Sequence, residues 1–412
     1  MKAVSLDSQR HLAGTPKPRV LDRMAEKLVR RQLAALETGR LTVLDGDRSD
    51  CYGRDGDFEA TITVREPAFW ADIAFGGSIG AGEAYMRGAW DCDDLVALMR
   101  LLLRNRHVLD GMEGGAARVT APLQKAFHWV NRNTRDGARR NISAHYDLGN
   151  DFFALWLDES MMYSSAIFEQ PDVPLHEAQL HRLDRICQRL DLQPDDHLVE
   201  IGTGWGGLAI HAATHYGCRV TTTTISKEQH RLAAERIAAA GLEDRIELLL
   251  SDYRDLEGEY DKLVSIEMIE AIGWRQYDTY FRKCGELLRP GGRLLIQAIT
   301  IAETRYEEAK RSVDFIQRYI FPGSNLPSVK AMVNAVAAQS DMMVTGLHDI
   351  GRDYALTLNH WRRRFLDRLE EVRALGYPDS FIRMWEYYLC YCEGGFEERA
   401  ISDVHLLAER PA

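Results

Sequence analysis

Apolar runs and amphipathic stretches alternate through the central part of the chain. Strand-like runs of β-branched and other apolar residues cover residues 199–201, 218–225, 246–250, 262–266 and 293–299. Helical spacing of apolar residues covers 208–216, and another helix is predicted after Ser226, which can serve as its N-cap. This alternation predicts an α/β fold with a doubly wound parallel sheet. Such sheets bind ligands at the carboxyl ends of their strands.

The N-terminal part of the chain has a different pattern. Residues 19–33 carry apolar side chains at helical spacing, which predicts an amphipathic helix. We expect its apolar face to lie in the core; the alternative is a membrane anchor. Alternation and short apolar runs predict strands at 40–44, 58–64 and 67–75, then a glycine-rich turn at 76–82 and two helices over 81–104. These elements predict a small α+β domain.

A polar, basic stretch at residues 131–141 separates the two patterns. The chain has 412 residues, which exceeds what one hydrophobic core usually holds. We therefore expect an N-terminal domain over residues 1–125, a linker over 126–142 and the main α/β domain over 143–412.

Composition narrows the functional classes. Hydrophobic residues make up 45% and charged residues 27% of the chain. No apolar run reaches the ~18 residues that span a membrane, and the N-terminus lacks the apolar core of a signal peptide. Seven scattered cysteines, none in a Cys-x-x-Cys pair, indicate cytosolic thiols and argue against a metal site. The net charge of −11 argues against a nucleic-acid partner.

The segment from Val199 to Gly207, which reads VEIGTGWGG, joins the first predicted strand of the sheet to its helix. Its glycines let the backbone pass close to a ligand, or they form a tight turn for structural reasons alone. The adjacent last glycines and the preceding acidic residue depart from the dinucleotide fingerprint. This form suits S-adenosylmethionine (SAM), which has no pyrophosphate. The predicted SAM contacts here are Glu200, Gly202, Gly204 and Gly206.

Residues near the next strand ends add candidate cofactor contacts. Thr224, rather than an acid, ends the second strand, and Gln229 beyond it can bind the ribose hydroxyls or be an exposed helix residue. Asp252, after the third strand, can meet the adenine amino group or cap the following turn. Upstream, Tyr163 and Ser164 can form a lid over the methionine end of SAM or belong to the core.

Residues 300–398 are rich in aromatic side chains. These rings can line a long apolar tunnel or form ordinary core. The residues concerned are Phe315, Tyr319, Phe321, Tyr354, Trp361, Phe365, Trp385, Tyr387 and Tyr388.

Ordered motifs run from the N-terminal domain to the end of the chain. They are GAGEAYMRGAW (80–90), HYDLGN (145–150), YSS (163–165), the Gly202 turn, TISKEQ (224–229), DYRD (252–255), EMIE (267–270), YIFPGSNLPS (319–328), DY (353–354) and YCEGGF (391–396). On these motifs, the chain from about residue 35 onward closely resembles the cyclopropane-fatty-acyl-phospholipid synthase family. These SAM-dependent enzymes modify double bonds in lipid acyl chains.

The resemblance implies a Rossmann-like SAM methyltransferase core, a small N-terminal lipid-binding domain and a homodimer. It also implies a cytoplasmic enzyme, peripheral to the inner face of the membrane, that acts on unsaturated phospholipid. In the family reaction the alkene attacks the SAM methyl group, and a bound bicarbonate then takes a proton from that group as the ring closes. The positions that hold the anion, and that we expect to be catalytic, correspond to Ser165, Glu270, Gln297, Ile299 and Tyr354.

Two of these positions depart from the family pattern. The best-known members have cysteine in place of Ser165 and histidine in place of Gln297. Serine and glutamine still donate hydrogen bonds to an oxyanion, but Gln297 cannot share a proton by ionising. The base is then bicarbonate, which we expect to be retained, or Glu270, whose carboxylate can instead simply stabilise a helix N-terminus. Tyr354 can donate to the anion or stabilise a cation through its ring.

We expect cyclopropane formation on phospholipid acyl chains. The chemical alternative from the same site is a hydride shift that gives a methyl- or methylene-branched acyl product. The alternative from another class is a non-catalytic lipid-binding protein. Methylation of a soluble small molecule fits poorly with the separate N-terminal domain and the aromatic C-terminal half.

Overall fold

The computed structural model describes residues 19–56, 58–114 and 148–412. The chain forms two compact units, residues 1–120 and 121–412. The predicted linker at 126–142 lies outside the described residues, so its boundaries stay a prediction.

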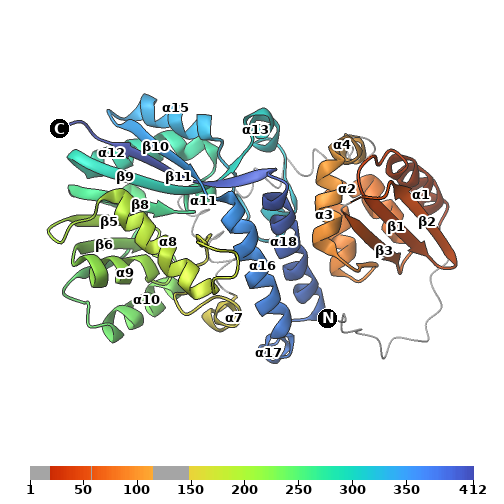
Figure 1. Cartoon of the computed structure of the whole chain (residues 1–412), viewed down its shortest axis with the longest axis horizontal. Coiled ribbons are helices and arrows are strands. Elements are labelled where there is room, and N and C mark those ends of the chain that lie inside the picture. Colours follow the sequence, from red (N-terminus) through yellow and green to blue (C-terminus); the bar gives the residue numbers. More distant parts are fainter. Residues whose placement is uncertain (1–18, 57, 115–147) are drawn as a thin grey trace. The chain divides into compact units, whose positions relative to one another are not determined.

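The first unit is an α+β domain whose four-stranded sheet has the order β2-β1-β3-β4 (Figure 1). β1 and β3 pair in parallel, whereas β2 and β4 pair with their neighbours antiparallel. The elements are α1 (Val20–Leu33), β1 (Arg40–Asp45), β2 (Arg48–Gly53), β3 (Glu59–Val64), α2 (Ala68–Met86), β4 (Trp90–Cys92), α3 (Leu95–Arg104) and α4 (Arg106–Gly114). The strands β2 and β4 were not predicted, because one is largely polar and the other has three residues.

The strand predicted at 67–75 is wrong, because this segment forms the first half of α2. Phe69, Trp70 and Ala74 are buried at helical spacing, but apolar residues on the other sides of the helix hide that period in the sequence. The predicted glycine-rich turn is a kink within α2. Gly77 leaves the helical conformation with φ 57° and ψ −142°, and the missing side chain of Gly80 lets the backbone approach the carbonyl of Asp72.

The predicted N-terminal helix is confirmed as α1, but its apolar residues divide between two faces. Ala25, Val29 and Leu33 are buried, as expected of core positions. A second set is exposed, contrary to the prediction that the apolar face is core. This set comprises Val20, Leu21, Met24 and Leu28.

The second unit contains a seven-stranded sheet in the order β10-β11-β9-β8-β5-β6-β7. Neighbours from β9 to β7 pair in parallel, and β11 pairs antiparallel with both β9 and β10. The predicted α/β fold is thus confirmed, with an antiparallel end that was not predicted. The strands are β5 (His197–Ile201), β6 (Arg219–Thr224), β7 (Ile246–Leu250), β8 (Tyr260–Ile266), β9 (Leu288–Ile301), β10 (Met343–Asp349) and β11 (Ile401–Glu409).

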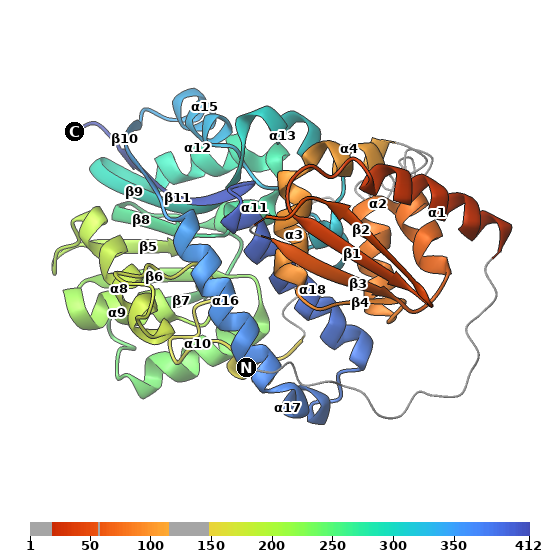
Figure 2. The ribbon, with the colours of Figure 1, turned by 45° about the vertical axis from the view of Figure 1, so that its right-hand side comes forward.

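Helices pack on both sides of this sheet (Figures 1 and 2). They are α7 (Asn150–Ala154), α8 (Leu175–Leu190), α9 (Gly207–Tyr216), α10 (Lys227–Ala239), the 3₁₀ turn η2 (Tyr253–Asp255), α11 (Ile269–Ile272), the 3₁₀ turn η3 (Trp274–Gln276), α12 (Tyr277–Leu287), α13 (Glu303–Ala309), α14 (Phe315–Tyr319), α15 (Val329–Gln339), α16 (Gly351–Asp367), α17 (Leu369–Ala374) and α18 (Asp379–Glu397).

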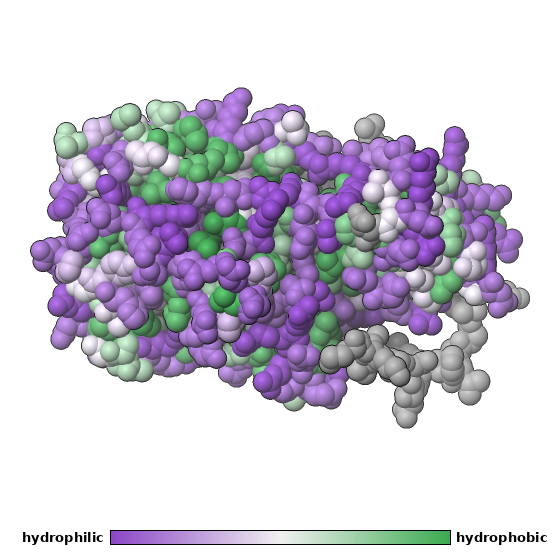
Figure 3. All heavy atoms as spheres, in the orientation of Figure 1, coloured by the Kyte–Doolittle hydropathy of each residue, from purple (hydrophilic) through white to green (hydrophobic). Residues whose placement is uncertain are grey.

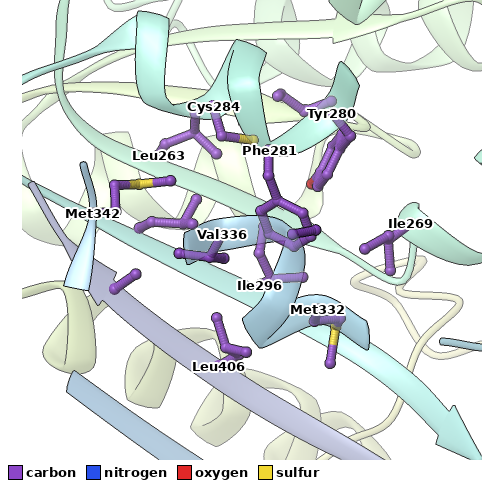
Figure 4. Packing of buried hydrophobic residues seen from close by; sticks show 14 of the residues in the cluster. Leu263, Ile269, Tyr280, Phe281, Cys284, Ile296, Met332, Val336, Met342 and Leu406 are labelled. Atoms are coloured by element: carbon purple, nitrogen blue, oxygen red, sulfur yellow. The ribbon is translucent and has the colours of Figure 1, made fainter. Parts of the chain in front are cut away.

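Each face of the sheet has its own hydrophobic core, because side chains alternate between the faces along a strand. Leu263 and Ile296 face one core, where they meet Phe281 of α12 and Val336 of α15 (Figure 4). Other strand residues face the second core, which α8, α9 and α10 complete. Those residues include Leu198, Val220, Val264 and Leu295.

The C-terminal helices α16 and α18 lie side by side and carry many of the aromatic residues singled out in the sequence. Trp361, Phe365 and Trp385 are almost fully buried. Phe152 of α7 contacts Trp385 edge to face, with ring centroids 4.9 Å apart. These rings therefore form packed core, and an acyl tunnel stays a prediction.

Among the described residues, no helix is both long and apolar enough to cross a bilayer. On the face shown in Figure 3, hydrophobic residues form scattered groups among hydrophilic ones.

Candidate active site

The glycine turn follows β5 at the carboxyl edge of the parallel strands. Gly202, Gly204 and Gly206 have φ values of 104°, 54° and 83°, which side-chain-bearing residues rarely adopt. A Cβ on Gly207 would lie 2.5 Å from the sulfur of Met162, so the segment before Tyr163 packs closely on the turn. A Cβ on Gly204 would meet no protein atom within 4 Å. The turn thus combines required glycines with open space above it.

Glu200 lies one residue before the end of β5 and is almost fully buried. One of its carboxylate oxygens accepts a 2.6 Å hydrogen bond from the hydroxyl of Thr222. Burial raises the pKa of Glu200 to about 8. A cationic ligand beside this group would favour its ionised form, and SAM carries a sulfonium.

This pKa predicts that SAM binding is linked to proton release. If Glu200 must ionise to face the cofactor, SAM affinity should rise with pH and level off above about 8. Below that value the affinity should fall by up to about tenfold per pH unit. Calorimetry in buffers with different ionisation enthalpies measures the released protons. Unchanged affinity between pH 6 and 8 would contradict this role, and Glu200→Gln should abolish the dependence.

At the end of β6, the second strand of the predicted series, the candidate side chains hydrogen-bond to each other. Thr224 donates a 2.8 Å hydrogen bond to the Oε1 of Gln229, and Ser226 caps α10 as predicted. Gln229 is buried, so the alternative that it is an exposed helix residue is wrong. Its contact with the ribose stays a prediction.

Asp252 caps the turn η2, which was the structural alternative for this residue. Its Oδ1 accepts from the backbone N–H and Nε of Arg254, at 3.0 and 2.7 Å, and its Oδ2 accepts from the guanidinium at 2.6 Å. Asp252 is thus held as the cap of η2, and its contact with the adenine amino group stays a prediction.

Tyr163 and Ser164 follow the segment that packs on the turn. The Tyr163 hydroxyl hydrogen-bonds that of Tyr388 at 2.9 Å, and the Ser164 carbonyl accepts from Gln179 at 2.9 Å. The Ser164 hydroxyl is buried without a hydrogen-bond partner. Together with the open glycine turn and buried Glu200, this unsatisfied hydroxyl fits a bound polar ligand such as SAM.

A carboxylate that was not predicted as a site residue lies at the centre of the catalytic cluster. Glu267 follows β8 and has a φ of 46°. Its Oε1 accepts from the backbone N–H of Ser165 at 2.9 Å and from Nε2 of Gln297 at 2.7 Å. Its Oε2 accepts from the hydroxyl of Tyr354 at 2.6 Å. Three of the five predicted catalytic residues therefore converge on Glu267.

The other two predicted residues pair with each other. Glu270 accepts a 2.5 Å hydrogen bond from the backbone N–H of Ile299 through Oε1. Its Oε2 is buried without a hydrogen-bond partner. Burial and the nearby charge of Glu267 raise the pKa of Glu270 to about 8, so the group is mostly neutral at pH 7.

The pairing of β9 with its neighbours positions the residues that surround Gln297. Gln297 on β9 pairs with Ile266 of β8 on one side and with His405 of β11 on the other. Its Nε2 also donates to Asp403 at 2.9 Å, and its Oε1 accepts from His405 at 3.0 Å and from Arg182 at 3.4 Å. All four hydrogen-bonding positions of the Gln297 amide are therefore in use.

The charges in this layer balance around Glu267. Arg182 is completely buried, and Glu267 is the largest influence that opposes the lowering of its pKa by burial. Burial and Glu267 raise the pKa of Asp403 well above its usual range, so Asp403 is neutral. Burial raises the pKa of Glu267 as well, whereas the hydrogen bonds from Tyr354 and Ser165 and the Arg182 cation lower it. These partners favour Glu267 as the ionised member of this carboxyl pair.

These residues do not fit the bicarbonate that the family resemblance implied. The predicted group is brought together, but its donors are already occupied. The amide of Gln297, the hydroxyl of Tyr354 and the N–H of Ser165 bind Glu267, and the N–H of Ile299 binds Glu270. A second anion would compete with Glu267 and Glu270 for these four donors. The signal for Glu267 was present in the sequence, since the motif EMIE holds two carboxylates.

The comparisons with known proteins bear on the same residues. The family profile described as mycolic acid cyclopropane synthetase matches residues 133–406. The protein belongs to this family. The matched region includes the glycine turn and every member of the Glu267 cluster.

Relatives of this family extend the match into the N-terminal unit. The tuberculostearic acid methyltransferase UfaA1 of Mycobacterium tuberculosis is 39% identical over 382 residues, which is 90% of this chain and 88% of that protein. The cyclopropane-fatty-acyl-phospholipid synthase of Escherichia coli K12 is 37% identical over 355 residues, 84% of this chain and 87% of that protein.

Solved structures of the family match about two thirds of the chain. The cyclopropane synthase MmaA2 from Mycobacterium tuberculosis matches 66% of this chain and 98% of its own, with a TM-score of 0.62 and 27% identity. The cyclopropane synthase CmaA1, solved with S-adenosylhomocysteine (SAH), matches the same shares with a TM-score of 0.62 and 29% identity. The protein is thus a SAM-dependent, lipid-modifying methyltransferase with a Rossmann-like core.

Proposed function

We propose that the protein transfers the methyl carbon of SAM to the double bond of an unsaturated phospholipid acyl chain and closes a cyclopropane ring. The observation that carries the proposal is the ionised Glu267, held by three donors next to the cofactor turn. Met268, its neighbour, lies against Gly202, where an added Cβ would be 3.4 Å from the methionine Cγ. A fixed anion at this place suits a reaction that develops positive charge on an apolar substrate.

SAM, when bound, supplies an electrophilic methyl group on its sulfonium. The surroundings of Tyr354 suit the cation that forms on the acyl chain. Its ring stacks on Phe396 with centroids 4.4 Å apart and meets Trp361 edge to face at 6.0 Å. All three residues are buried, so they exclude water that would trap the cation as an alcohol.

A branched product is the second candidate, because two relatives are named methyltransferases rather than cyclopropane synthases. One relative with high identity over most of the chain is named a tuberculostearic acid methyltransferase. A probable fatty acid methyltransferase of Pseudomonas putida is 33% identical over 384 residues. A hydride shift before the transferred methyl group loses its proton would leave a methylene branch. Ring and branch need the same cofactor site and the same base.

The exposed face of α1 supports a peripheral position at a membrane surface. Val20, Leu21, Met24 and Leu28 lie within about a third of the helix circumference, since residues four apart share a face. A row of exposed basic residues runs beside them. Its members are Arg23, Lys27 and Arg31. Apolar side chains next to basic ones suit the boundary between anionic head groups and acyl chains, although the whole chain is acidic.

Met24→Glu is expected to weaken binding to anionic phospholipid vesicles by about tenfold or more. The change removes an apolar side chain from the interface and adds a charge that the head groups repel. Met343→Glu on β10 is the matched control, because Met343 is 67% exposed and Met24 is 66% exposed. Vesicle co-sedimentation measures both. Equal binding by the two variants would exclude α1 as the membrane contact.

The proposed function is tested with vesicles of mono-unsaturated phospholipid and SAM. Extracted acyl chains should gain the mass of one CH2, and vesicles of saturated phospholipid should gain none. SAH should form in step with the modified lipid. SAH formation without lipid modification, or equal modification of saturated chains, would refute the proposal.

A further inference from the structure

We propose that Glu267 is the catalytic base of this enzyme and that its carboxylate takes the place of bicarbonate. The inference rests on the proposed transfer of a methyl carbon to an alkene. It assigns a role to a residue of this chain that the resemblance to the family did not include, and it corrects our expectation that bicarbonate is retained.

The groups that hold Glu267 are among those expected to hold bicarbonate. The positions assigned to bicarbonate binding include Ser165, Gln297 and Tyr354, and each donates a hydrogen bond of 2.6–2.9 Å to Glu267. A bicarbonate ion and a glutamate carboxylate present the same pair of oxygens to such donors. The side chain therefore occupies an oxyanion site that belongs to the protein's own fold.

The balance of charge around Glu267 also argues against a bound bicarbonate. The described cluster contains one buried cation, Arg182, and Glu267 is the carboxyl group that most favours its charge. Neutral Asp403 and mostly neutral Glu270 add no further negative charge at pH 7. A bicarbonate beside Glu267 would place two anions against a single buried cation, and like charges at such a distance repel strongly in a low-dielectric interior.

Backbone strain and solvent exposure also distinguish Glu267 from the residues around it. Glu267 holds a φ of 46°, in the region that favours glycine, and its N–H is fixed by a 2.8 Å hydrogen bond to the carbonyl of Gln297. Strain of this kind persists where the surrounding structure enforces it, often at functional sites. Glu267 also keeps partial solvent access, whereas Ser165, Gln297 and Glu270 are buried.

In the proposed step, each bond that forms is matched by a bond that breaks. The π pair of the alkene bonds to the methyl carbon, and the carbon–sulfur pair stays on sulfur, which gives SAH and a cation on the neighbouring chain carbon. Glu267 takes one proton from the transferred methyl group. The pair of that C–H bond closes the third side of the ring. Glu267 ends as a neutral acid and returns its proton to water after the product leaves.

A structural role, in which Glu267 merely neutralises Arg182, makes different predictions. It gives no reason for an added anion to restore turnover once the carboxylate is removed. Glu267→Gly removes the side chain, relieves the backbone strain and opens a space lined by the same donors. Bicarbonate that enters this space can take over the proton.

The test measures turnover on unsaturated vesicles in buffer stripped of carbonate under argon, with and without added bicarbonate. The wild-type rate should change less than about twofold, whereas Glu267→Gly should lose about 10³-fold and regain at least tenfold with bicarbonate. Glu267→Gln is the matched control that leaves no space, and bicarbonate should not rescue it. SAM affinity, measured by calorimetry, reports whether each variant is folded.

Two outcomes would overturn the inference. A wild-type enzyme that loses most of its activity without bicarbonate overturns it directly, and this result needs no variant. A folded Glu267→Gly that bicarbonate does not rescue also overturns it. In both cases the proposed function stands. A wild-type enzyme that transfers no carbon to unsaturated lipid under either condition overturns the proposed function, and the inference with it.

Discussion

Glu267→Gln is expected to lower turnover on unsaturated phospholipid by about 10³-fold, the usual size of a lost general base. The amide cannot take a proton from the transferred methyl group. It also removes the negative charge that balances Arg182 and turns one acceptor into a donor that faces the Ser165 N–H or the Tyr354 hydroxyl. Single-turnover rates with SAM prebound isolate this step from binding.

Glu270→Gln is the comparison that makes this result informative. Glu270 has a pKa of about 8 and is mostly neutral at pH 7, so glutamine resembles its prevailing form. The amide oxygen can still accept from Ile299. We therefore expect a loss of about tenfold or less. The opposite order, with the larger loss in Glu270→Gln, would identify Glu270 as the base and exclude Glu267.

Gly204→Leu is expected to weaken SAM binding by at least about 100-fold, because the side chain would fill the open space above the turn. No protein atom lies within 4 Å of the added Cβ, so the fold itself can accept the residue. The φ of 54° lies in the left-handed region, where a side chain costs about 1–2 kcal/mol of stability.

Gly376→Leu separates the cofactor effect from the backbone cost. Gly376 lies between α17 and α18, has a φ of 93°, and also has open space at its Cβ. It should lose stability without losing SAM affinity. Thermal melting and calorimetry measure the two quantities. Similar SAM affinities in the two variants would mean that the cofactor does not lie over Gly204.

The central strands β5, β6, β8 and β9 were predictable because they are largely buried on both faces. Runs such as 262–266 are apolar whichever side they face, and Ser226 gave a clear start to α10. The segment 67–75 was mistaken for a strand because α2 is also apolar on several sides. Local pattern cannot separate a buried helix from a buried strand over so few residues.

The site was predictable where chain order alone brings residues together. Glu200 lies near the end of a parallel strand, and Gly202 and Asp252 follow such strands, so the three residues lie at one edge of the sheet. The role of Glu267 was missed because its partners come from distant segments: Ser165 is 102 residues away and Tyr354 is 87. In sequence it is one of two acids in a short motif, and tertiary contacts alone distinguish it.

The most direct test of the account uses SAM labelled with ¹³C in its methyl group, vesicles of mono-unsaturated phospholipid, and NMR of the extracted lipid. We predict that the label appears in a cyclopropane carbon whose protons resonate upfield of all other acyl protons. Label in a methyl or methylene branch would support the same active site, but the product would be the branched acyl chain and not the ring. Absence of label from the acyl chains, with SAM bound at the glycine turn, would contradict the account.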